Sequence, residues 1–411
     1  MTKWLEKTLG EVTSFMKKGI PPKYTVEESE KTIRVLNQKC NRNFEISYSE
    51  SRLHDCEKKI VPADKMLRAG DVLINSTGIG TAGRVAQVVE VKGPTTIDGH
   101  MILLRPSEEL NPIYYGYAVK AFQSQIEGLA EGSTGQTEIN RMRLQDEVII
   151  KYPKDKLVQE NIGRFLSNID DKIKTNTEIN KNLEEQAQAI FKSWFVDFEP
   201  FGGIQPSEMQ FIPLQELCKV VTKGTTPTTL GKSFTSTGIN FIKAESILDN
   251  HSIDSSKFAF IDEETNALLK RSVIKANDIV FTIAGTLGRF AMVDNSVLPA
   301  NTNQAVAIIR PDETKVTPAY LYSFFIGNWH NEYYSKRIQQ AVQANLSLTT
   351  IKSLPIAVLK NTTMNNYDKL VSPLFALMKS NEEENRRLSK LRDTLLPRLM
   401  SGELDVSNLD L

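Results

Sequence analysis

Residues 165–195 read FLSNIDDKIKTNTEINKNLEEQAQAIFKSWF and carry the clearest periodic pattern in the chain. Seam residues recur at alternating spacings of four and three, which is the heptad period of a coiled coil. The seam comprises Ile162, Leu166, Ile169, Ile173, Asn176, Asn180, Leu183, Ala187, Ile190 and Trp194. The pattern predicts a long helix, over about residues 155–196, that pairs with a second helix.

A second seam follows 205 residues later, in a helix expected over about residues 366–400. It comprises Tyr367, Val371, Leu374, Met378, Asn381, Asn385, Leu388, Arg392, Leu395 and Leu399. Each seam has two asparagines in its middle, and a buried asparagine needs a polar partner. Antiparallel pairing would bring Asn176 level with Asn385 and Asn180 with Asn381, so that the four amides set the register. The alternative is that they lie on a solvated face.

The same offset runs through the rest of the chain. Gly19 and Gly224 are 205 residues apart, and so are Arg84 and Arg289 in the motifs GTAGR and GTLGR. Short β-type runs separated by Gly, Pro and Asn precede each long helix, which indicates a duplicated unit. We expect an α+β fold, with two globular domains separated by two long antiparallel helices forming a coiled coil with internal pseudo-two-fold symmetry. The boundaries are a first domain (1–153), a first helix (154–200), a second domain (201–362) and a second helix with a tail (363–411).

Composition limits the classes of function. Of the 411 residues, 50 are Lys or Arg and 50 are Asp or Glu, so the formal net charge is zero. A protein that binds nucleic acid through bulk charge is excluded, whereas a local basic surface is not. The three cysteines and four scattered histidines have no zinc-type spacing. The N-terminus has no signal-peptide pattern and no apolar run is long enough to cross a membrane, so we expect a cytoplasmic protein.

The segment GIGTAG (78–83) fits the glycine pattern of dinucleotide-binding loops. Such a loop should open a helix, but the following RVAQVVEV reads as a strand, and the second copy, IAGTLG, lacks the first glycine. A glycine-rich hairpin ending in Arg84 or Arg289 fits better, and its guanidinium could bind a phosphate or a guanine edge. The alternative is a plain turn with a surface arginine.

Further polar residues stand in loop-like contexts in both copies. Amides can read adenine in the major groove and lysines can contact phosphate, although each could equally be an ordinary turn or surface residue. These candidates are Lys18, Lys39, Gln136, Lys223, Lys243, Asn303, Gln304 and Gln343. The motifs NPIYY (111–115) and TPAYLY (317–322) indicate helix starts with proline in the first turn. No catalytic set of residues recurs in both copies.

Two α+β domains, each followed by a helix with a heptad seam, resemble the specificity (S) subunit of type I restriction–modification systems. The residues that carry the resemblance are the AGDVLINST…GTAGR and ANDIVFTI…GTLGR segments, the pair LLRP (103–106) and IIRP (308–311), and the two seams, the second ending in LRDTLLPRLMSGEL (391–404). Arg392 in the second seam, with Pro373 and Pro397, departs from the pattern and predicts a shorter or bent second helix.

The resemblance implies a non-catalytic subunit of a phage-defence complex. Each globular domain would be a target-recognition domain for one half of a bipartite, asymmetric double-stranded DNA site, and the helices would fix the spacer between the halves. The resemblance also implies two adenine-methyltransferase (M) subunits and two restriction (R) subunits as partners. S-adenosylmethionine, ATP and Mg²⁺ would bind to those partners, with no cofactor or metal in this chain. The alternatives are a coiled-coil scaffold that does not bind DNA and a nucleotide-dependent enzyme built on GIGTAG.

Overall fold

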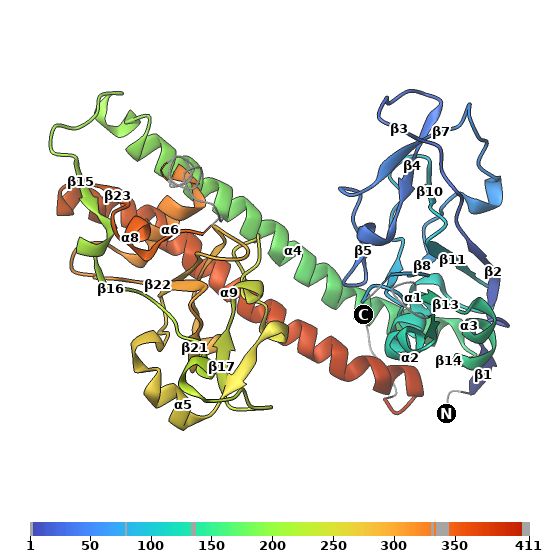
Figure 1. Cartoon of the computed structure of the whole chain (residues 1–411). Helices are drawn as coiled ribbons and strands as arrows, with labels where there is room; N and C mark the ends of the chain where they lie inside the picture. Colours follow the sequence, from blue (N-terminus) through green and yellow to red (C-terminus); the bar gives the residue numbers. More distant parts are fainter. Residues whose placement is uncertain (1–2, 79, 133–136, 330–332, 334–344, 405–411) are drawn as a thin grey trace. The chain divides into compact units, whose positions relative to one another are not determined.

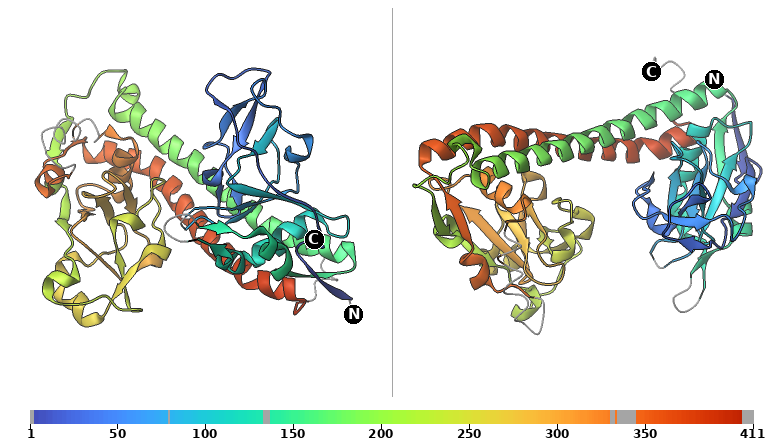
Figure 2. Two further views of the ribbon diagram at one scale, coloured as in Figure 1. Left: turned by 45° about the vertical axis from the view of Figure 1, so that its right-hand side comes forward. Right: turned by 90° about the horizontal axis from the view of Figure 1, so that it is seen from above.

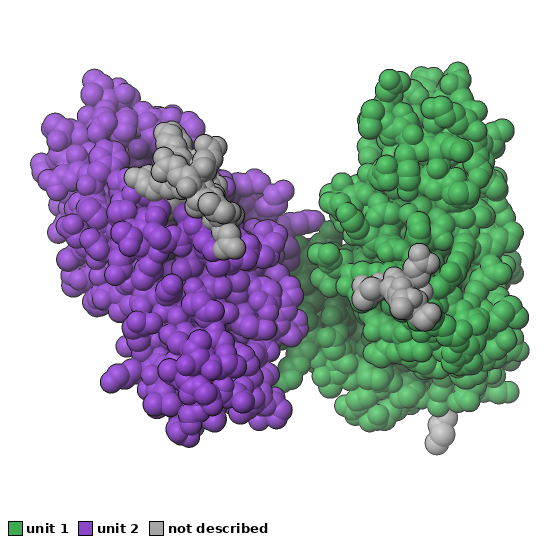
Figure 3. Space-filling view, in the orientation of Figure 1, with its two compact units in different colours: residues 1–174, 386–411 green, residues 175–385 purple. Residues whose placement is uncertain are grey.

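The computed structural model describes residues 3–78, 80–132, 137–329, 333 and 345–404. Its contacts divide the chain into two compact units, coloured separately in Figure 3. Unit 1 comprises residues 1–174 and 386–411, and unit 2 comprises residues 175–385. Each unit therefore contains one α+β domain together with part of both long helices. The four segments expected from the sequence are consecutive stretches of the chain. Each of the two units, in contrast, groups the residues that contact one another, wherever they stand in the sequence.

The domain of unit 1 is built on two four-stranded sheets (Figure 1). The described strands are β1 (Trp4–Thr8), β2 (Thr13–Lys18), β3 (Tyr24–Thr25), β4 (Thr32–Leu36), β5 (Asn41–Arg42), β6 (Glu45–Ile46), β7 (Arg52–Asp55), β8 (Val72–Asn75), β9 (Val85–Gln87), β10 (Thr95–Ile97), β11 (Met101–Pro106), β12 (Ala130–Glu131), β13 (Glu138–Ile139) and β14 (Ile149–Pro153). The large sheet has the order β2-β11-β8-β9 and is antiparallel. The second sheet has the order β10-β4-β7-β3, and the pairs β1–β14, β12–β13 and β5–β6 are separate.

The domain of unit 2 repeats this arrangement. Its described strands are β15 (Gln210–Pro213), β16 (Cys218–Lys223), β17 (Ile239–Ile242), β18 (Ala259–Ile261), β19 (Ile279–Thr282), β20 (Phe290–Met292), β21 (Ala300–Thr302), β22 (Val306–Pro311) and β23 (Pro355–Val358). The large sheet has the order β16-β22-β19-β20, the second sheet β18-β17-β21, and β15 pairs with β23. The two large sheets correspond strand by strand, which confirms the duplication read from the sequence.

The central strand of each large sheet is apolar on both faces, because both faces are covered. In β8, Val72 and Ile74 enter the core around the first short helix, whereas Leu73 enters the core shared with the second sheet. In unit 2, Ile279 of β19 likewise enters the core around the helices, and Val280 enters the core shared with the second sheet. Successive side chains of a strand point to opposite faces, so one continuous apolar run fills two cores.

Each domain also contains short helices. They are α1 (Pro112–Ala121), α2 (Gln123–Gly128) and α3 (Arg141–Glu147) in unit 1, and α5 (Glu263–Leu268), α6 (Pro318–Ile326) and α8 (Leu348–Lys352) in unit 2. The Asn111 side chain caps α1 by accepting from the backbone N–H of Ile113, and Thr317 caps α6 through the N–H of Tyr320. Both helices have proline at the first position, so NPIYY and TPAYLY are helix starts, as predicted.

Two long helices complete the fold: α4 (Lys156–Phe195) and α9 (Asn361–Ser401). Every predicted seam residue on both helices is buried or half-buried. In unit 1, Ile162 of α4 shares a core with Leu399 of α9. In unit 2, Leu183 of α4 shares a core with Val371 of α9, and Figure 2 shows the two helices side by side there. Within each unit, residues late in one helix therefore meet residues early in the other, which is antiparallel pairing.

The second helix is not shortened by its prolines, contrary to one of the two expectations above. Helix α9 contains 41 residues against 40 in α4, and Pro373 and Pro397 both lie inside it. Arg392 is accommodated in the seam because its Nη1 donates to Asp170 Oδ1 of α4 at 2.6 Å. Among the helices of the described residues, none is both long and apolar enough to span a lipid bilayer.

Candidate nucleic-acid interface

One end of each large sheet collects most of the residues singled out from the sequence. In unit 1, strand register places the end of β2 beside the start of β11, which lies beside the end of β8 and the start of β9. Lys18 and Arg84 are therefore at the same end of the sheet. In unit 2, the register of β16, β22, β19 and β20 brings Lys223 and Arg289 to the corresponding end. We call these two regions the loop ends of units 1 and 2.

The glycine-rich segment of unit 1 is a hairpin loop between β8 and β9. The N–H of Gly83 donates to the carbonyl of Asn75 at 2.8 Å and so closes the loop. The Arg84 guanidinium donates from Nη2 to the carbonyl of Gly80 at 2.9 Å. Since a strand and not a helix follows, the loop does not have the geometry of a dinucleotide-binding motif. This agrees with the sequence interpretation.

A network of polar side chains lies beside this hairpin at the loop end. Lys18 forms an ion pair with Glu138. The backbone of Glu138 forms an antiparallel β-bridge with that of Thr77. The amide of Gln38 contacts the Thr77 hydroxyl. Lys39, next along the chain, is exposed. Gln38, Thr77 and Glu138 were not found from the sequence, because their partners lie 39 and 120 residues away and no local pattern connects them.

The arginine of unit 2 has a different partner. Arg289 donates from Nε to Asp249 Oδ1 and from Nη2 to Asp249 Oδ2, both at 2.6 Å, and from Nη1 to the carbonyl of Ile247 at 3.3 Å. A guanidinium has five N–H donors, so three of them are directed to these acceptors. Asp249 is itself 82% exposed. The two equivalent arginines are thus held by a backbone carbonyl in one unit and by a carboxylate in the other.

The remaining candidates of unit 2 lie in neighbouring loops. Lys223 is exposed at the end of β16, and Lys243 lies 2.6 Å from Glu245 Oε1. The ammonium of Lys243 lowers the pKa of the Glu245 carboxyl.

Asn303 accepts from the backbone N–H of Ala305 at 3.1 Å, and Gln304 accepts from the hydroxyl of Thr226. Lys39 and Lys243 are not strictly equivalent, because Lys243 precedes the 3-10 turn after its strand whereas Lys39 lies inside one. Gln136 and Gln343 fall outside the described residues.

Several candidate cations are therefore already paired with carboxylates in the free chain. Lys18, Lys243 and Arg289 each contact a carboxylate whose side chain is more than half exposed. An exposed pair of this kind contributes about 0–1 kcal/mol, so a phosphate could replace the carboxylate at small cost. Among the described residues, no group of three His, Cys, Asp or Glu side chains is placed to hold a metal ion.

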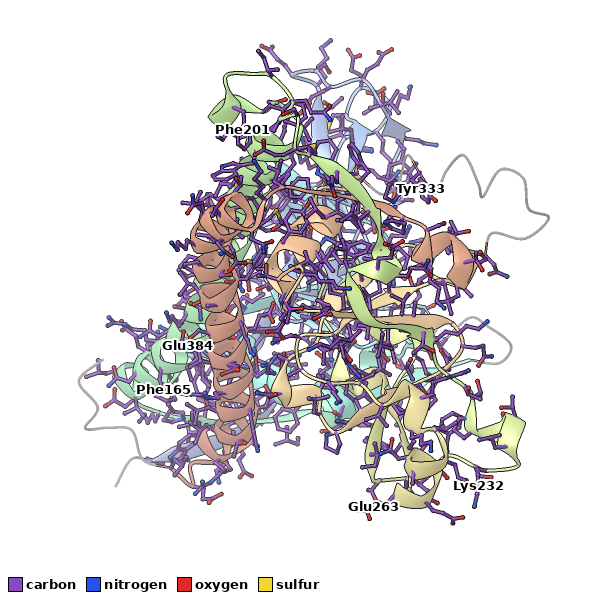
Figure 4. The ribbon with its side chains drawn as sticks, turned by 90° about the vertical axis from the view of Figure 1, so that its left-hand side faces the viewer. Phe165, Phe201, Lys232, Glu263, Tyr333 and Glu384 are labelled. Atoms are coloured by element: carbon purple, nitrogen blue, oxygen red, sulfur yellow. The ribbon has the colours of Figure 1, made fainter. Side chains whose placement is uncertain are left out.

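The asparagines of the helix pair form the reciprocal arrangement that the heptad seam predicts. Asn176 donates from Nδ2 to Asn385 Oδ1 at 2.9 Å, and Asn381 donates from Nδ2 to Asn180 Oδ1 at 2.8 Å. Asn176 also donates to Oε2 of Glu384, which is labelled on α9 in Figure 4, at 2.7 Å. Asn176 is fully buried and Asn381 is 9% exposed, so the alternative of a solvated face is wrong. Their role in setting the register stays a prediction.

Comparison with known proteins identifies relatives over nearly the whole chain. The model of the family described as the type I restriction modification DNA specificity domain matches residues 1–185 and 206–360. The chain is 25% identical over 386 residues to the type I restriction enzyme MjaIX specificity subunit of Methanocaldococcus jannaschii, covering 89% of this chain and 83% of that protein. It is 26% identical over 323 residues to the HindI specificity subunit of Haemophilus influenzae, covering 61% and 68%.

A solved structure also shares the fold. The crystal structure of the S subunit of a type I restriction–modification system from M. genitalium aligns with a TM-score of 0.58. The alignment covers 97% of this chain and 96% of that one, at 18% sequence identity. At this level of identity the likeness concerns the fold alone.

Proposed function

The chain belongs to the family of type I restriction–modification specificity subunits, and we propose from this that each of its units recognises one half of a bipartite double-stranded DNA target. Specificity subunits are the non-catalytic components of type I restriction enzymes, and they supply recognition of the DNA target. The function of this chain is accordingly to select DNA and not to modify or cut it.

The duplicated loop ends carry the proposal of two half-sites. Each unit presents a glycine hairpin, an arginine and a lysine-glycine turn, which begins at Lys18–Gly19 in unit 1 and at Lys223–Gly224 in unit 2, at the same end of the same kind of sheet. Equivalent positions nevertheless have different chemistry, since Arg84 contacts a backbone carbonyl and Arg289 a carboxylate. Base recognition depends on which donors and acceptors reach the groove. Two such surfaces should therefore read two different short sequences, which makes the whole target asymmetric.

The helix pair is the proposed docking surface for partner subunits. Leu370 and Leu377 of α9 lie seven residues apart in unit 2 and are 47% and 48% exposed, outside the paired seam. Exposed leucines on a helix whose other face is already paired favour contact with another protein. We propose that two methyltransferase subunits dock here and that two restriction subunits join through them. S-adenosylmethionine, ATP and Mg²⁺ would then be bound by those partners.

Sequencing of methylated adenines tests this function. DNA is exposed to the chain assembled with its methyltransferase partner, and the modified positions are mapped. We expect two short, different half-sites separated by a spacer of fixed length. Modification at a single continuous motif, or without any sequence preference, would contradict the proposal.

A coiled-coil scaffold without DNA binding is distinguished by a salt titration. The affinity for random duplex is measured by fluorescence anisotropy over a range of salt concentrations. DNA binding through phosphate contacts gives a linear fall of log affinity with log salt, whereas a scaffold gives no such slope.

A further inference from the structure

The turn that follows strand β2 gathers lysines that the surface described above does not include. Lys65 donates from Nζ to the carbonyl of Gly19 at 2.8 Å, and Lys59 donates from Nζ to the carbonyl of Pro21 at 3.5 Å. Both lysines come from the segment between β7 and β8, and both ammonium groups converge on the turn 19–21. This turn lies at the loop end of unit 1, directly after Lys18.

A buried histidine holds the two segments together. His54 has no exposed surface, its Nδ1 accepts from the backbone N–H of Lys23 at 2.8 Å, and its Nε2 lies 2.7 Å from the carbonyl of Lys59. Because Nδ1 accepts from Lys23, Nε2 is the nitrogen that donates to the carbonyl of Lys59. The core of the domain, and not a loose loop, thus places Lys59 beside the turn.

The cations at this turn are not balanced by equally close carboxylates. Lys17 is 3.0 Å from Asp64, but neither Lys59 nor Lys65 has a carboxylate within 4.0 Å in the described part of the chain. Burial lowers the pKa of Lys65; Asp64 opposes this effect, whereas Lys17 and Lys59 add to it. Like charges held together by the fold repel one another unless an anion lies between them.

Unit 2 has a comparable contact, made by one basic residue. Lys270 follows Lys65 by the offset of 205 and also belongs to a 3-10 turn before the central strand. Its neighbour Arg271 donates from Nη2 to the hydroxyl of Thr225, at 3.3 Å, in the turn that follows β16. The feature is therefore duplicated: in both units, a basic residue from this segment contacts the lysine-glycine turn.

We propose that these two turns are phosphate-binding sites for the DNA backbone, formed by Lys59 and Lys65 in unit 1 and by Arg271 in unit 2. An ammonium group has three N–H donors, so each lysine anchored by one of them keeps two for phosphate oxygens. Contacts of this kind fix the position of a protein on the duplex without reading its sequence. The inference rests on the proposed function and adds to it the place where each domain binds the DNA backbone.

The test measures the salt dependence of binding of the full chain to a duplex of random sequence. Each phosphate contact contributes about 0.9 to the slope of log affinity against log salt. We expect Lys59→Gln to reduce the slope by about 0.9 and Lys59→Gln with Lys65→Gln to reduce it by about 1.8. The matched control is Lys181→Gln on helix α4, whose side chain is 80% exposed and faces Glu185; its slope should equal that of the unaltered chain.

Three further measurements separate the outcomes. The thermal midpoint of each variant reports whether loss of the bond between Lys65 and Gly19 disturbs the fold, and Lys59→Arg should restore the slope lost in Lys59→Gln. Inorganic phosphate at matched ionic strength should compete no better than chloride; selective competition by phosphate would indicate a small-anion site instead. Unchanged slopes in folded variants, with a steep slope in the unaltered chain, would overturn the inference. A flat slope in the unaltered chain would instead overturn the proposed function.

Discussion

Asp71, directly before β8, and Arg105 of β11 form a bidentate ion pair in the large sheet of unit 1. Nε donates to Oδ1 at 2.7 Å and Nη2 to Oδ2 at 2.9 Å, and Asp71 is 1% exposed. Asp278 and Arg310 repeat the pair in unit 2, with both distances at 2.7 Å. The recurrence of GD and ND before the central strand, and of LRP and IRP after it, thus reflects one buried contact made twice.

Replacement of Asp71 by alanine should strongly destabilise unit 1. The change leaves the Arg105 guanidinium, whose side chain is only 15% exposed, without its carboxylate, which costs about 3–5 kcal/mol. Urea unfolding of the full chain measures the effect. The control is Glu57→Ala, which removes an ion pair with Lys31 whose side chains are 63% and 66% exposed and should change the free energy of unfolding by about 1 kcal/mol or less. Equal effects of the two substitutions would show that the buried pair is not a stabilising element.

The sequence predicts the parts of this structure in which spacing translates directly into geometry. A heptad seam fixes which face of α4 is buried. Antiparallel pairing of the two seams then predicts the partners of Asn176 and Asn180. The repeated glycines and arginines likewise identify equivalent turns and strand ends.

Contacts between loops could not be predicted in this way. Asp249 meets Arg289 across 40 residues, and Lys65 meets Gly19 across 46. No periodicity connects such positions, because their meeting depends on how two irregular segments pack against the sheet. The repeated glycine motif identified Arg289 as a candidate, but neither its carboxylate partner nor the lysines of the turn.

The amide pair of the helix seam should show strong coupling in a double-mutant cycle. Asn176→Leu or Asn385→Leu alone leaves the amide of the other asparagine without its partner, which we expect to cost about 1–3 kcal/mol. Asn176→Leu together with Asn385→Leu should recover most of that loss, because two apolar side chains can pack in place of the pair. Chemical denaturation of the four proteins gives a coupling energy, expected within about 0.5–3 kcal/mol. Additive effects would mean that the two amides stabilise the helix pair independently.

The lysine-glycine turn should not tolerate a side chain at its glycine. A Cβ on Gly19 would lie 2.1 Å from the carbonyl oxygen of Asp98, and one on Gly224 would lie 1.9 Å from that of Thr302. Because backbone atoms must move, Gly19→Ala should cost about 1–3 kcal/mol or more. Gly128→Ala is the control, since a Cβ there would meet no neighbouring group of the described residues within 4 Å; it should be neutral or stabilise by up to about 1 kcal/mol. A thermal midpoint for Gly19→Ala equal to that of the control would refute this account of the turn.

Unit 2 should lose stability in mild acid through His251. The ring stacks on Phe290 with centroids 4.1 Å apart, and burial lowers the pKa of His251, although Asp249 raises it to a smaller extent. The unfolded chain therefore binds more protons than the folded one once the pH falls below about 6.5, and stability decreases from there down to the lower folded pKa. Thermal midpoints between about pH 8 and pH 5.5 measure this loss.

The matched variant for this effect is His251→Asn. Residue 251 has a φ of +61°, a conformation that asparagine tolerates, and asparagine does not titrate. The variant should lose part of the acid dependence of the midpoint, whereas His100→Asn, which removes an imidazole that is 65% exposed, should retain it. An unchanged dependence in His251→Asn would assign the acid sensitivity to other groups. Glu184 is not one of them, because burial raises its pKa and its protonation therefore favours the folded chain as the pH falls.

The two hairpin arginines should act on different halves of the DNA target. Arg84→Ala should weaken or relax selection at one half-site and Arg289→Ala at the other, each by about 1–3 kcal/mol, which is about 5- to 150-fold in affinity for the intact site. Asp249→Ala, which frees the guanidinium that Asp249 holds at 2.6 Å, should affect the same half-site as Arg289→Ala and leave the other unchanged. Mapping of methylated adenines with each variant, assembled with the methyltransferase partner, reads both halves in one experiment. Simultaneous loss of both half-sites in any one variant would contradict independent recognition by the two units, because Arg84 and Arg289 belong to separate sheets with separate cores.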